Sequence, residues 1–420
     1  MVKKVLRKLL EYGPYLFIIK LKRLVFNKTI RFIWKMILNN QDSVNLNKNG
    51  INLIGFYKYS FGIAEVARAF TKSILGSNIK FDIVNIESDI HSKIEKSELE
   101  EFKKYFRIIP SYYKNVFFIN GNLMDSFYQT NAELFRNKYN IGVWWWEFET
   151  GNESFIPGFA MLDEVFVFTE FIKQSFLNLP HGNCKITKIT YPLTNDMQIL
   201  CDKRETRREY RIDEGDFVVF FNFDYLSGYE RKNPEGVLKA FKMAFEKNKN
   251  CRLILKTSNS EACPDKVENI LSLINKYSLE KNLIIINKVL TKKGIMNLLS
   301  GIDCYISLHR GEGFGLGMLE AMSIGKPVIA TNYGGNLEFM NESNSYLVSH
   351  KMVKANDDYQ VYKDVKYWAE PDLDHAVFCL KEIYENPSLT ERRCIKAKSD
   401  IKRIYFSGNF SEEIHKALEM

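Results

Sequence analysis

The chain has 420 residues, 45% of them apolar and 26% charged, with a formal net charge of +8. This length suits two domains that each bury a core, and the composition excludes a disordered protein. The seven cysteines form no C-x-x-C pair, so we expect core thiols in a reducing compartment and neither a disulfide framework nor a zinc site.

The basic charge is concentrated at the start of the chain. Residues 1–40 carry ten Lys or Arg residues against Glu11 alone, a net +9, which leaves −1 for the remaining residues. Their longest uncharged run is eight residues, too short for a membrane-spanning helix or a signal peptide. Basic and apolar side chains with Trp34 predict a segment on an anionic membrane surface, and packing on protein is the alternative. Nucleic-acid binding is not expected, because the body has no basic excess.

From residue 41 onward, short apolar runs alternate with helical segments. Strands are predicted at 51–56, 81–86, 116–120, 141–146 and 164–169, and a helix at 62–75. Polar sequence from 202 to 216 interrupts the pattern, and further strands are predicted at 217–223, 251–256, 283–287, 304–308 and 328–331. The alternation is typical of parallel sheets covered on both faces. We therefore predict an α/β protein of two doubly wound domains that face each other across a cleft.

Two motifs mark the first half of the chain. Residues 60–68 join a strand to a helix, and we expect Glu65 and Arg68 to point away from the apolar face of that helix. At 144–146 three consecutive tryptophans precede Glu147. They cannot all face one side of a strand, so at least one turns away from its neighbours. Aromatic faces stack on sugar rings, and core packing is an equal alternative.

The segment 309–331 is the most informative part of the chain. Glu312 lies in a Gly-rich turn after an apolar run, and Glu320 lies in the helical stretch that follows. This is a βαβ unit with its loop at the carboxyl end of a strand, where open parallel sheets bind ligands. Gly315 lets the backbone approach a ligand, and the N–H groups near Leu316 face an anion. A phosphate between two carboxylates that grip hydroxyls suggests a sugar nucleotide.

This segment resembles the E-x7-E signature of retaining family 4 glycosyltransferases, which have the GT-B architecture of two Rossmann-like domains. The resemblance extends over roughly residues 50–390. It implies that Glu320 holds the ribose hydroxyls of a nucleotide and that Glu312 is the catalytic carboxylate beside the donor sugar. It also implies donor contacts by Phe314, Gly315 and Leu316. His309 either contacts the sugar or packs in the core.

The resemblance also implies a domain plan. An N-terminal extension spans 1–40, an acceptor-side domain 41–200, a nucleotide-sugar domain 201–387, and a helical segment that crosses back to the first domain 388–420.

Basic residues of the second domain are assigned to the donor diphosphate by the same resemblance. Lys232 matches the family lysine, Arg231 stands beside it, and Lys256 compensates for an arginine that many relatives carry. Fixed cations stabilise the charge that develops on a leaving diphosphate. A solvated basic pair at a helix start is the alternative for residues 231–232.

The motif at 60–68 resembles the glycine loop and entry helix of a bacterial, mannosyltransferase-like subgroup. Gly62 would approach the donor phosphates, whereas Ala64 departs from the subgroup pattern. The segment with Trp146 and Glu147 also fits the subgroup and is assigned to the acceptor side.

The resemblance implies a retaining, metal-independent hexosyltransferase that uses GDP-mannose or a related GDP-sugar, with UDP-sugars as the alternative. The implied acceptor is a surface glycan or lipid-linked oligosaccharide, and the expected location is cytoplasmic, at the inner face of the cell membrane. No cofactor or metal is expected, because the D-x-D sequence at Asp372 and Asp374 suits a helix cap. Two rivals are a GT-B nucleotide-sugar epimerase and a catalytically silent scaffold of a polysaccharide assembly complex.

Overall fold

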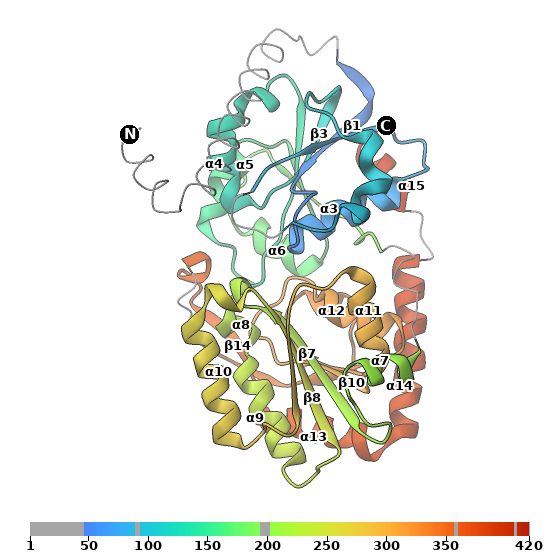
Figure 1. Cartoon of the computed structure of the whole chain (residues 1–420). Helices are drawn as coiled ribbons and strands as arrows, with labels where there is room; N and C mark the ends of the chain where they lie inside the picture. Colours follow the sequence, from blue (N-terminus) through green and yellow to red (C-terminus); the bar gives the residue numbers. More distant parts are fainter. Residues whose placement is uncertain (1–45, 89–92, 194–201, 357–359, 407–409, 420) are drawn as a thin grey trace, which may run out of the picture.

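A computed structural model describes residues 46–88, 93–193, 202–356, 360–406 and 410–419 (Figure 1). The basic extension at 1–40 and the expected boundary between residues 200 and 201 lie outside the described residues. Figure 1 shows two stacked α/β bodies, the first built around β1 to β6 and the second around β7 to β12.

The first domain contains a six-stranded parallel sheet in the order β2-β1-β3-β4-β5-β6. Its strands are β1 (Asn47–Gly55), β2 (Phe81–Asn85), β3 (Tyr112–Phe118), β4 (Tyr139–Val143), β5 (Glu164–Val167) and β6 (Lys185–Lys188). All five strands predicted in this half are present. The edge strand β6 was missed, because Lys-Ile-Thr-Lys lacks an apolar run. The strand predicted at 141–146 ends at Val143, since the tryptophans leave the sheet.

Helices cover both faces of this sheet. They are α3 (Gly62–Ile74), α4 (Gly121–Asn131), α5 (Ile156–Phe159) and α6 (Glu170–Leu177). Arg68, which was expected to point away from the apolar face of α3, is not exposed to solvent. Its side chain is buried on α3 and donates two 2.8 Å hydrogen bonds, to the carbonyls of Tyr57 and Tyr59. Arg68 thus fixes the turn between β1 and α3, which lies at the edge of the cleft.

The second domain contains another six-stranded parallel sheet, in the order β12-β11-β10-β7-β8-β9. Its strands are β7 (Phe217–Asp224), β8 (Cys251–Ser258), β9 (Leu283–Asn287), β10 (Cys304–Ser307), β11 (Val328–Thr331) and β12 (Tyr346–Val348). The strand order reverses between β7 and β10, which places a switch point there. The sequence predicted the first five of these strands, and the short edge strand β12 was missed.

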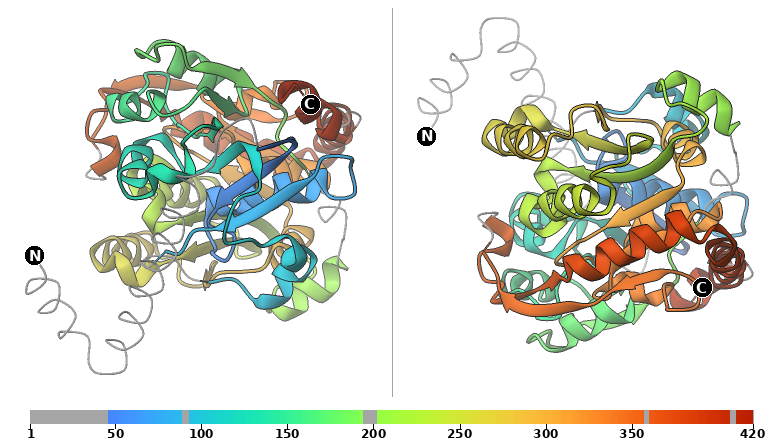
Figure 2. Two further views of the ribbon diagram at one scale, coloured as in Figure 1. Left: turned by 90° about the horizontal axis from the view of Figure 1, so that it is seen from above. Right: turned by 90° about the horizontal axis from the view of Figure 1, so that it is seen from below.

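Helices also cover both faces of the second sheet (Figure 2). They are α7 (Lys203–Glu209), α8 (Tyr229–Lys232), α9 (Pro234–Phe245), α10 (Pro264–Tyr277), α11 (Lys292–Gly301), α12 (Leu316–Ser323), α13 (Leu373–Glu385) and α14 (Pro387–Ile401). One apolar core unites α9, α10 and α13, and another includes α11, α12 and α14. The 3₁₀ helices are η2 (Lys96–Tyr105), η3 (Ala132–Leu134), η4 (Glu153–Phe155), η6 (Tyr225–Ser227), η7 (Ser260–Ala262), η8 (Gly335–Glu338) and η9 (Gln360–Tyr362), and η10 (Lys402–Phe406) is π-helical.

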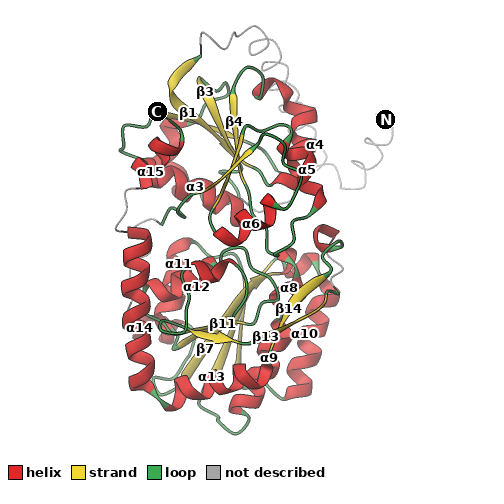
Figure 3. Cartoon of the chain, turned by 180° about the vertical axis from the view of Figure 1, so that it is seen from behind, coloured by secondary structure: helices red, strands yellow, loops and turns green. Residues whose placement is uncertain are grey.

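A two-stranded antiparallel sheet is added to this plan. Strands β13 (His350–Lys354) and β14 (Tyr367–Pro371) pair with each other, in the register His350 to Pro371. Figure 3 shows the pair on the side of the second domain where α8 also lies, with its connection close to the first domain. Neither strand was predicted from the sequence.

The end of the chain spans both domains. Helix α14 runs along the second domain, and α15 (Phe410–Ala417) lies against α3 of the first (Figure 1). The rings of Phe70 and Phe410 meet edge to face, with their centroids 5.3 Å apart. The backbone N–H of Thr190 donates to the Glu413 carboxylate over 2.9 Å. The two domains are therefore tied together by the last helix.

The hydrophobic core is continuous between the domains. Tyr191 of the first domain stacks on Phe314 of the second, with ring centroids 4.6 Å apart. The Thr169 hydroxyl donates to the Gly313 carbonyl over 3.1 Å. Among the described helices, none combines the length and apolar character needed to cross a bilayer.

Candidate active site

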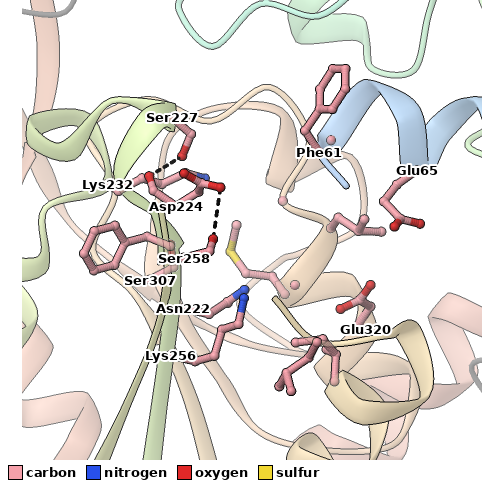
Figure 4. A pocket seen from close by; sticks show the side chains of 18 of the residues that line it. Phe61, Glu65, Asn222, Asp224, Ser227, Lys232, Lys256, Ser258, Ser307 and Glu320 are labelled. Carbon is pink, nitrogen blue, oxygen red and sulfur yellow. Dashed lines mark hydrogen bonds between the residues drawn. The ribbon is translucent and has the colours of Figure 1, made fainter. Parts of the chain in front are cut away.

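A cavity of about 330 Å³ lies between the two domains, at the carboxyl ends of β7 and β10. This is the switch point of the second sheet, where open parallel sheets bind ligands. Figure 4 shows Asn222, Lys232 and Lys256 on one side, and Phe61, Glu65 and Glu320 on another. Seven residues that the sequence assigned to the site line this cavity: Gly62, Lys232, Lys256, Glu312, Gly315, Leu316 and Glu320.

Glu312 is held in the loop that follows β10. Its carboxylate accepts a 2.6 Å hydrogen bond from the Lys232 ammonium, and the Arg231 guanidinium lies 3.8 Å away. Burial raises the pKa of this carboxyl, but Lys232 and Arg231 together outweigh burial and lower the pKa to about 2. Glu312 is therefore ionised at neutral pH and places a negative charge at the wall of the cavity.

Arg231 differs from the sequence prediction. Its guanidinium donates 2.7 Å hydrogen bonds to the carbonyls of Gly311 and Ser227, and it does not line the cavity. These bonds hold the arginine against the protein backbone. The assignment of Arg231 to the diphosphate therefore does not fit the structure, whereas Lys232 beside it does line the cavity.

Glu320 lies on α12 and is paired with a residue that sequence analysis missed. The Lys292 ammonium, at the start of α11, donates to the Glu320 carboxylate. Both residues line the cavity, so the carboxylate is open to a ligand on one side. The lysine is 28 residues before Glu320, in a polar turn with no motif, and only the fold brings the two together.

Lys256 is a buried cation that faces the cavity. It lies on β8 and is 8% exposed, and its ammonium forms no hydrogen bond or ion pair with any residue that the structure describes. Burial lowers the pKa of its ammonium, and the nearby carboxylates of Asp224 and Glu320 oppose this shift. A buried ammonium without a partner favours an anion in the adjoining space.

The start of α12 adds an anion-binding feature. Gly315 precedes the helix with φ +92°, a conformation that favours glycine, and the free N–H groups of the first turn begin at Leu316. On the first domain, Gly62 also lines the cavity. A Cβ placed on Gly62 would meet nothing within 4 Å, so its lack of a side chain leaves room for a ligand rather than for a packed neighbour.

Two other predicted residues belong to the core. Phe314 is 1% exposed and packs on Tyr191. His309 is fully buried, accepts a hydrogen bond at Nδ1 from Ser307 over 3.0 Å and donates from Nε2 to the Tyr333 carbonyl over 2.9 Å. Burial lowers the pKa of His309 to about 4, so it is neutral at pH 7. Neither side chain lines the cavity, and of the two alternatives for His309 the core role fits.

The residues assigned to the acceptor side also lie outside the cavity. Trp146 is buried and donates from Nε1 to the Thr150 carbonyl over 2.7 Å. Glu147 faces the Arg231 guanidinium over 3.9 Å. All three tryptophans pack against aromatic rings, which is the core-packing alternative for this motif.

Several polar residues of the cavity were not predicted. They are Ser60, Glu65, Asn222, Asp224, Ser227, Ser258, Lys292, Tyr305 and Ser307. Tyr305 donates to Asn222 over 2.6 Å. Ser258 donates to Asp224 over 3.0 Å, as Figure 4 shows. Asn222 and Asp224 end the predicted strand at 217–223, so their position at a sheet edge is the signal that could have found them.

The D-x-D sequence forms a helix cap, as predicted. The Asp372 carboxylate accepts a hydrogen bond from the His375 N–H at the start of α13. Within the described residues, no three His, Cys, Asp or Glu side chains gather closely enough to hold a metal ion.

The second domain is similar to a known enzyme family. Residues 202–360 match the family model of Glycosyl transferases group 1. A stretch of 136 residues is 29% identical to N-acetyl-alpha-D-glucosaminyl L-malate synthase of Bacillus anthracis and covers 32% of each chain. Alpha-1,3/1,6-mannosyltransferase ALG2 of Mus musculus is 22% identical over 61% of this chain and 58% of its own. The chain thus matches less than two thirds of either relative's length.

Solved structures resemble nearly the whole chain. Anabaena HepE, crystallised with UDP and glucose, superposes with a TM-score of 0.69 at 12% identity, over 88% of this chain and 99% of its own. Sucrose-phosphate synthase from Thermosynechococcus elongatus gives a TM-score of 0.66 at 14% identity, over 89% of this chain and 98% of its own. The chain has the GT-B fold, and its residues 202–360 are similar to the group 1 glycosyl transferases.

Proposed function

We propose that the chain is a glycosyltransferase that moves a sugar from a nucleoside diphosphate sugar to an acceptor hydroxyl. One observation carries the proposal: a single cavity brings together the two carboxylates of the E-x7-E motif, the unpartnered ammonium of Lys256 and the start of α12. The carboxylates suit hydroxyl groups, and the cation and helix start suit a diphosphate.

The reaction is proposed to be retaining and metal-independent. The bond from the sugar carbon to the diphosphate oxygen breaks, and the electron pair leaves with that oxygen. The acceptor oxygen forms the new bond on the same face, and its proton passes to the departing phosphate. Lys256 and Lys232 stabilise the leaving charge, while ionised Glu312 stabilises the electron-poor sugar.

The donor is proposed to be GDP-mannose or a related GDP-sugar, following the sequence resemblance. The mannosyltransferase relative agrees with the sugar. UDP-sugars are the rival, since HepE was crystallised with UDP. The acceptor is proposed to be a surface glycan or lipid-linked oligosaccharide at the inner face of the membrane.

The donor and the metal requirement are tested together. The full chain is mixed with GDP-mannose, UDP-glucose and UDP-N-acetylglucosamine, and melting temperature and donor hydrolysis are measured with and without EDTA. A donor at 100 times its Kd should stabilise the fold by about 2.7 kcal/mol, and hydrolysis should persist in EDTA. If no donor stabilises the protein, the glycosyltransferase proposal fails. Epimerised product without transfer would favour the epimerase.

Replacing Glu320 tests the ribose contact. Glu320→Ala should weaken donor binding by about 1.5–3 kcal/mol in calorimetry, the range for a hydrogen bond to a charged group. The control is Asp216→Ala, because Asp216 is also buried and paired, with Arg252 over 2.9 Å, at the opposite end of the sheet. Asp216→Ala should cost stability without affecting the donor. Equal affinity in wild type and Glu320→Ala would refute the ribose role.

Replacing Lys256 should change stability and binding in opposite directions. Its lowered pKa means that the charged form destabilises the empty fold at pH 7, a cost relieved as pH rises through the folded pKa. Lys256→Met should therefore raise the melting temperature of the empty protein and weaken nucleotide binding about tenfold or more.

Lys326→Met is the matched control for Lys256. Lys326 is a half-buried lysine whose pKa burial lowers to about 8, and its ammonium donates 2.8 Å bonds to the carbonyls of Ser300 and Ile302. Because Lys326 also has a lowered pKa but does not line the cavity, its replacement should leave nucleotide affinity unchanged whatever it does to the melting temperature. Unchanged nucleotide affinity in Lys256→Met would remove Lys256 from the donor site.

The basic extension is proposed to bind an anionic membrane surface. Each basic residue contributes about 1 kcal/mol at such a surface, and salt screens it. The full chain should sediment with vesicles containing phosphatidylglycerol better than with neutral vesicles, and less so at high salt. Deletion of residues 1–40 should abolish this and keep donor binding. Failure of the full chain to sediment at low salt, or of the deletion to fold, would contradict the membrane role.

A further inference from the structure

The connection between β13 and β14 places one aromatic side chain between the two domains. Tyr362 is 5% exposed. Its ring lies against Trp146 and Phe148 of the first domain, with centroid distances of 5.8 and 5.2 Å. The Arg231 guanidinium lies over the same ring, 5.5 Å from its centroid. Tyr362 therefore fills the space between the first domain and Arg231.

The fit around Tyr362 is close. A Cβ on Gly228 would lie 2.6 Å from the Tyr362 ring, so Gly228 leaves the room in which the ring sits. The preceding residue is also anchored, since the Asn152 side chain donates to the Val361 carbonyl over 3.2 Å. The first domain thus holds the end of this connection through a hydrogen bond and through ring contacts.

Arg231 connects Tyr362 to the loop that carries Glu312 through hydrogen bonds. Its guanidinium donates to the Gly311 carbonyl, and its own carbonyl accepts a 2.7 Å bond from the Arg310 N–H. The base of the β13–β14 pair holds the same loop, because Arg310 donates to Glu370 over 3.0 Å and lies over Trp368. The loop that carries Glu312 is therefore gripped by the β13–β14 segment at two places.

We propose that Tyr362 is a positioning residue, which fixes Arg231 and thereby holds the Glu312 backbone and carboxylate in place for sugar transfer. The proposal rests on the proposed catalytic role of Glu312. The β13–β14 connection would then hold the Glu312 loop in place, although it belongs neither to the six-stranded sheet nor to the lining of the donor cavity. Donor binding uses Glu320 and Lys256, which Tyr362 does not touch, so Tyr362 should act on kcat and spare donor KM.

Three variants of the full chain test this. Tyr362→Leu keeps apolar bulk but loses the ring, Tyr362→Phe keeps the ring, and Phe410→Leu removes a different aromatic contact between the domains. Donor hydrolysis is measured with the nucleotide sugar that stabilises the wild type best. Tyr362→Leu should lower kcat on the order of 100-fold, as a small misplacement of a reacting group does. Its donor KM should stay within about threefold. Tyr362→Phe keeps the ring but loses the hydroxyl's hydrogen bond to Arg231, so its kcat should fall between those of the wild type and Tyr362→Leu, whereas Phe410→Leu should match the wild type.

Hydrogen exchange gives a readout that does not need activity. The Arg310 N–H donates to the Arg231 carbonyl and the Gly335 N–H to the Glu312 carbonyl, each over 2.7 Å. Exchange across 309–313 and at Gly335 should be faster in Tyr362→Leu than in wild type or Phe410→Leu, because local opening exposes these amides. If the wild type hydrolyses no donor, the proposed function fails. Hydrogen exchange then still tests whether Tyr362 holds the Glu312 loop in place.

Three results would overturn the positioning role. The first is unchanged kcat together with unchanged exchange in Tyr362→Leu. The second is an equal loss in Phe410→Leu, which would indicate general weakening between the domains. The third is a loss confined to donor KM, which would place Tyr362 in donor binding.

Discussion

The position of the Glu312 loop depends on how closely three backbone segments approach one another. A Cβ on Gly313 would lie 2.5 Å from the Trp146 carbonyl of the first domain, and a Cβ on Gly335 would overlap the Gly313 carbonyl. No side chain fits at either position, so glycine is a packing requirement here. The two domains can approach this closely only because Gly313 and Gly335 have no side chains. The cavity beside Glu312 and the aromatic contact of Phe314 both follow from that approach.

Charge in the cavity is balanced unevenly. Glu312 and Glu320 each have an ammonium partner, Lys232 and Lys292, whereas Lys256 has none among the described residues. Each carboxylate is already paired with a lysine, so a ligand hydroxyl that binds the carboxylate must displace that lysine. Binding is therefore favoured for a ligand that also carries an anion with which the displaced lysine can pair. A nucleoside diphosphate sugar does both, because its hydroxyls and phosphates alternate along one molecule. The empty site thus holds two ion pairs and a third ammonium, that of Lys256, which has no salt-bridge partner among the described residues although the Asp224 carboxylate also lines the cavity.

The features predicted from the sequence are those that depend on the pattern of neighbouring residues. Apolar runs located the strands of both sheets except the edge strands β6 and β12, and the glycines around Glu312 located the loop at the switch point. The sequence could not predict contacts between distant segments. Lys292 meets Glu320 only through the packing of α11 beside α12, and the tryptophans at 144–146 turn inward because aromatic rings of α5, α6 and the second domain surround them. The β13–β14 pair escaped notice because His-Lys-Met-Val-Lys is mostly polar.

Arg231 and Lys232 show why a basic pair in a sequence need not be one site. Both lie on the single turn of α8, where neighbouring side chains point about 100° apart. Asn233 ends that turn in a left-handed conformation, with φ 54°. One side chain must therefore enter the protein when the other enters the cavity. The planar guanidinium can satisfy two carbonyls and an aromatic face at once, whereas the ammonium is better suited to a ligand that comes and goes. Arg231 is therefore the residue that points into the protein, where it contacts both the Tyr362 ring and the loop that carries Glu312.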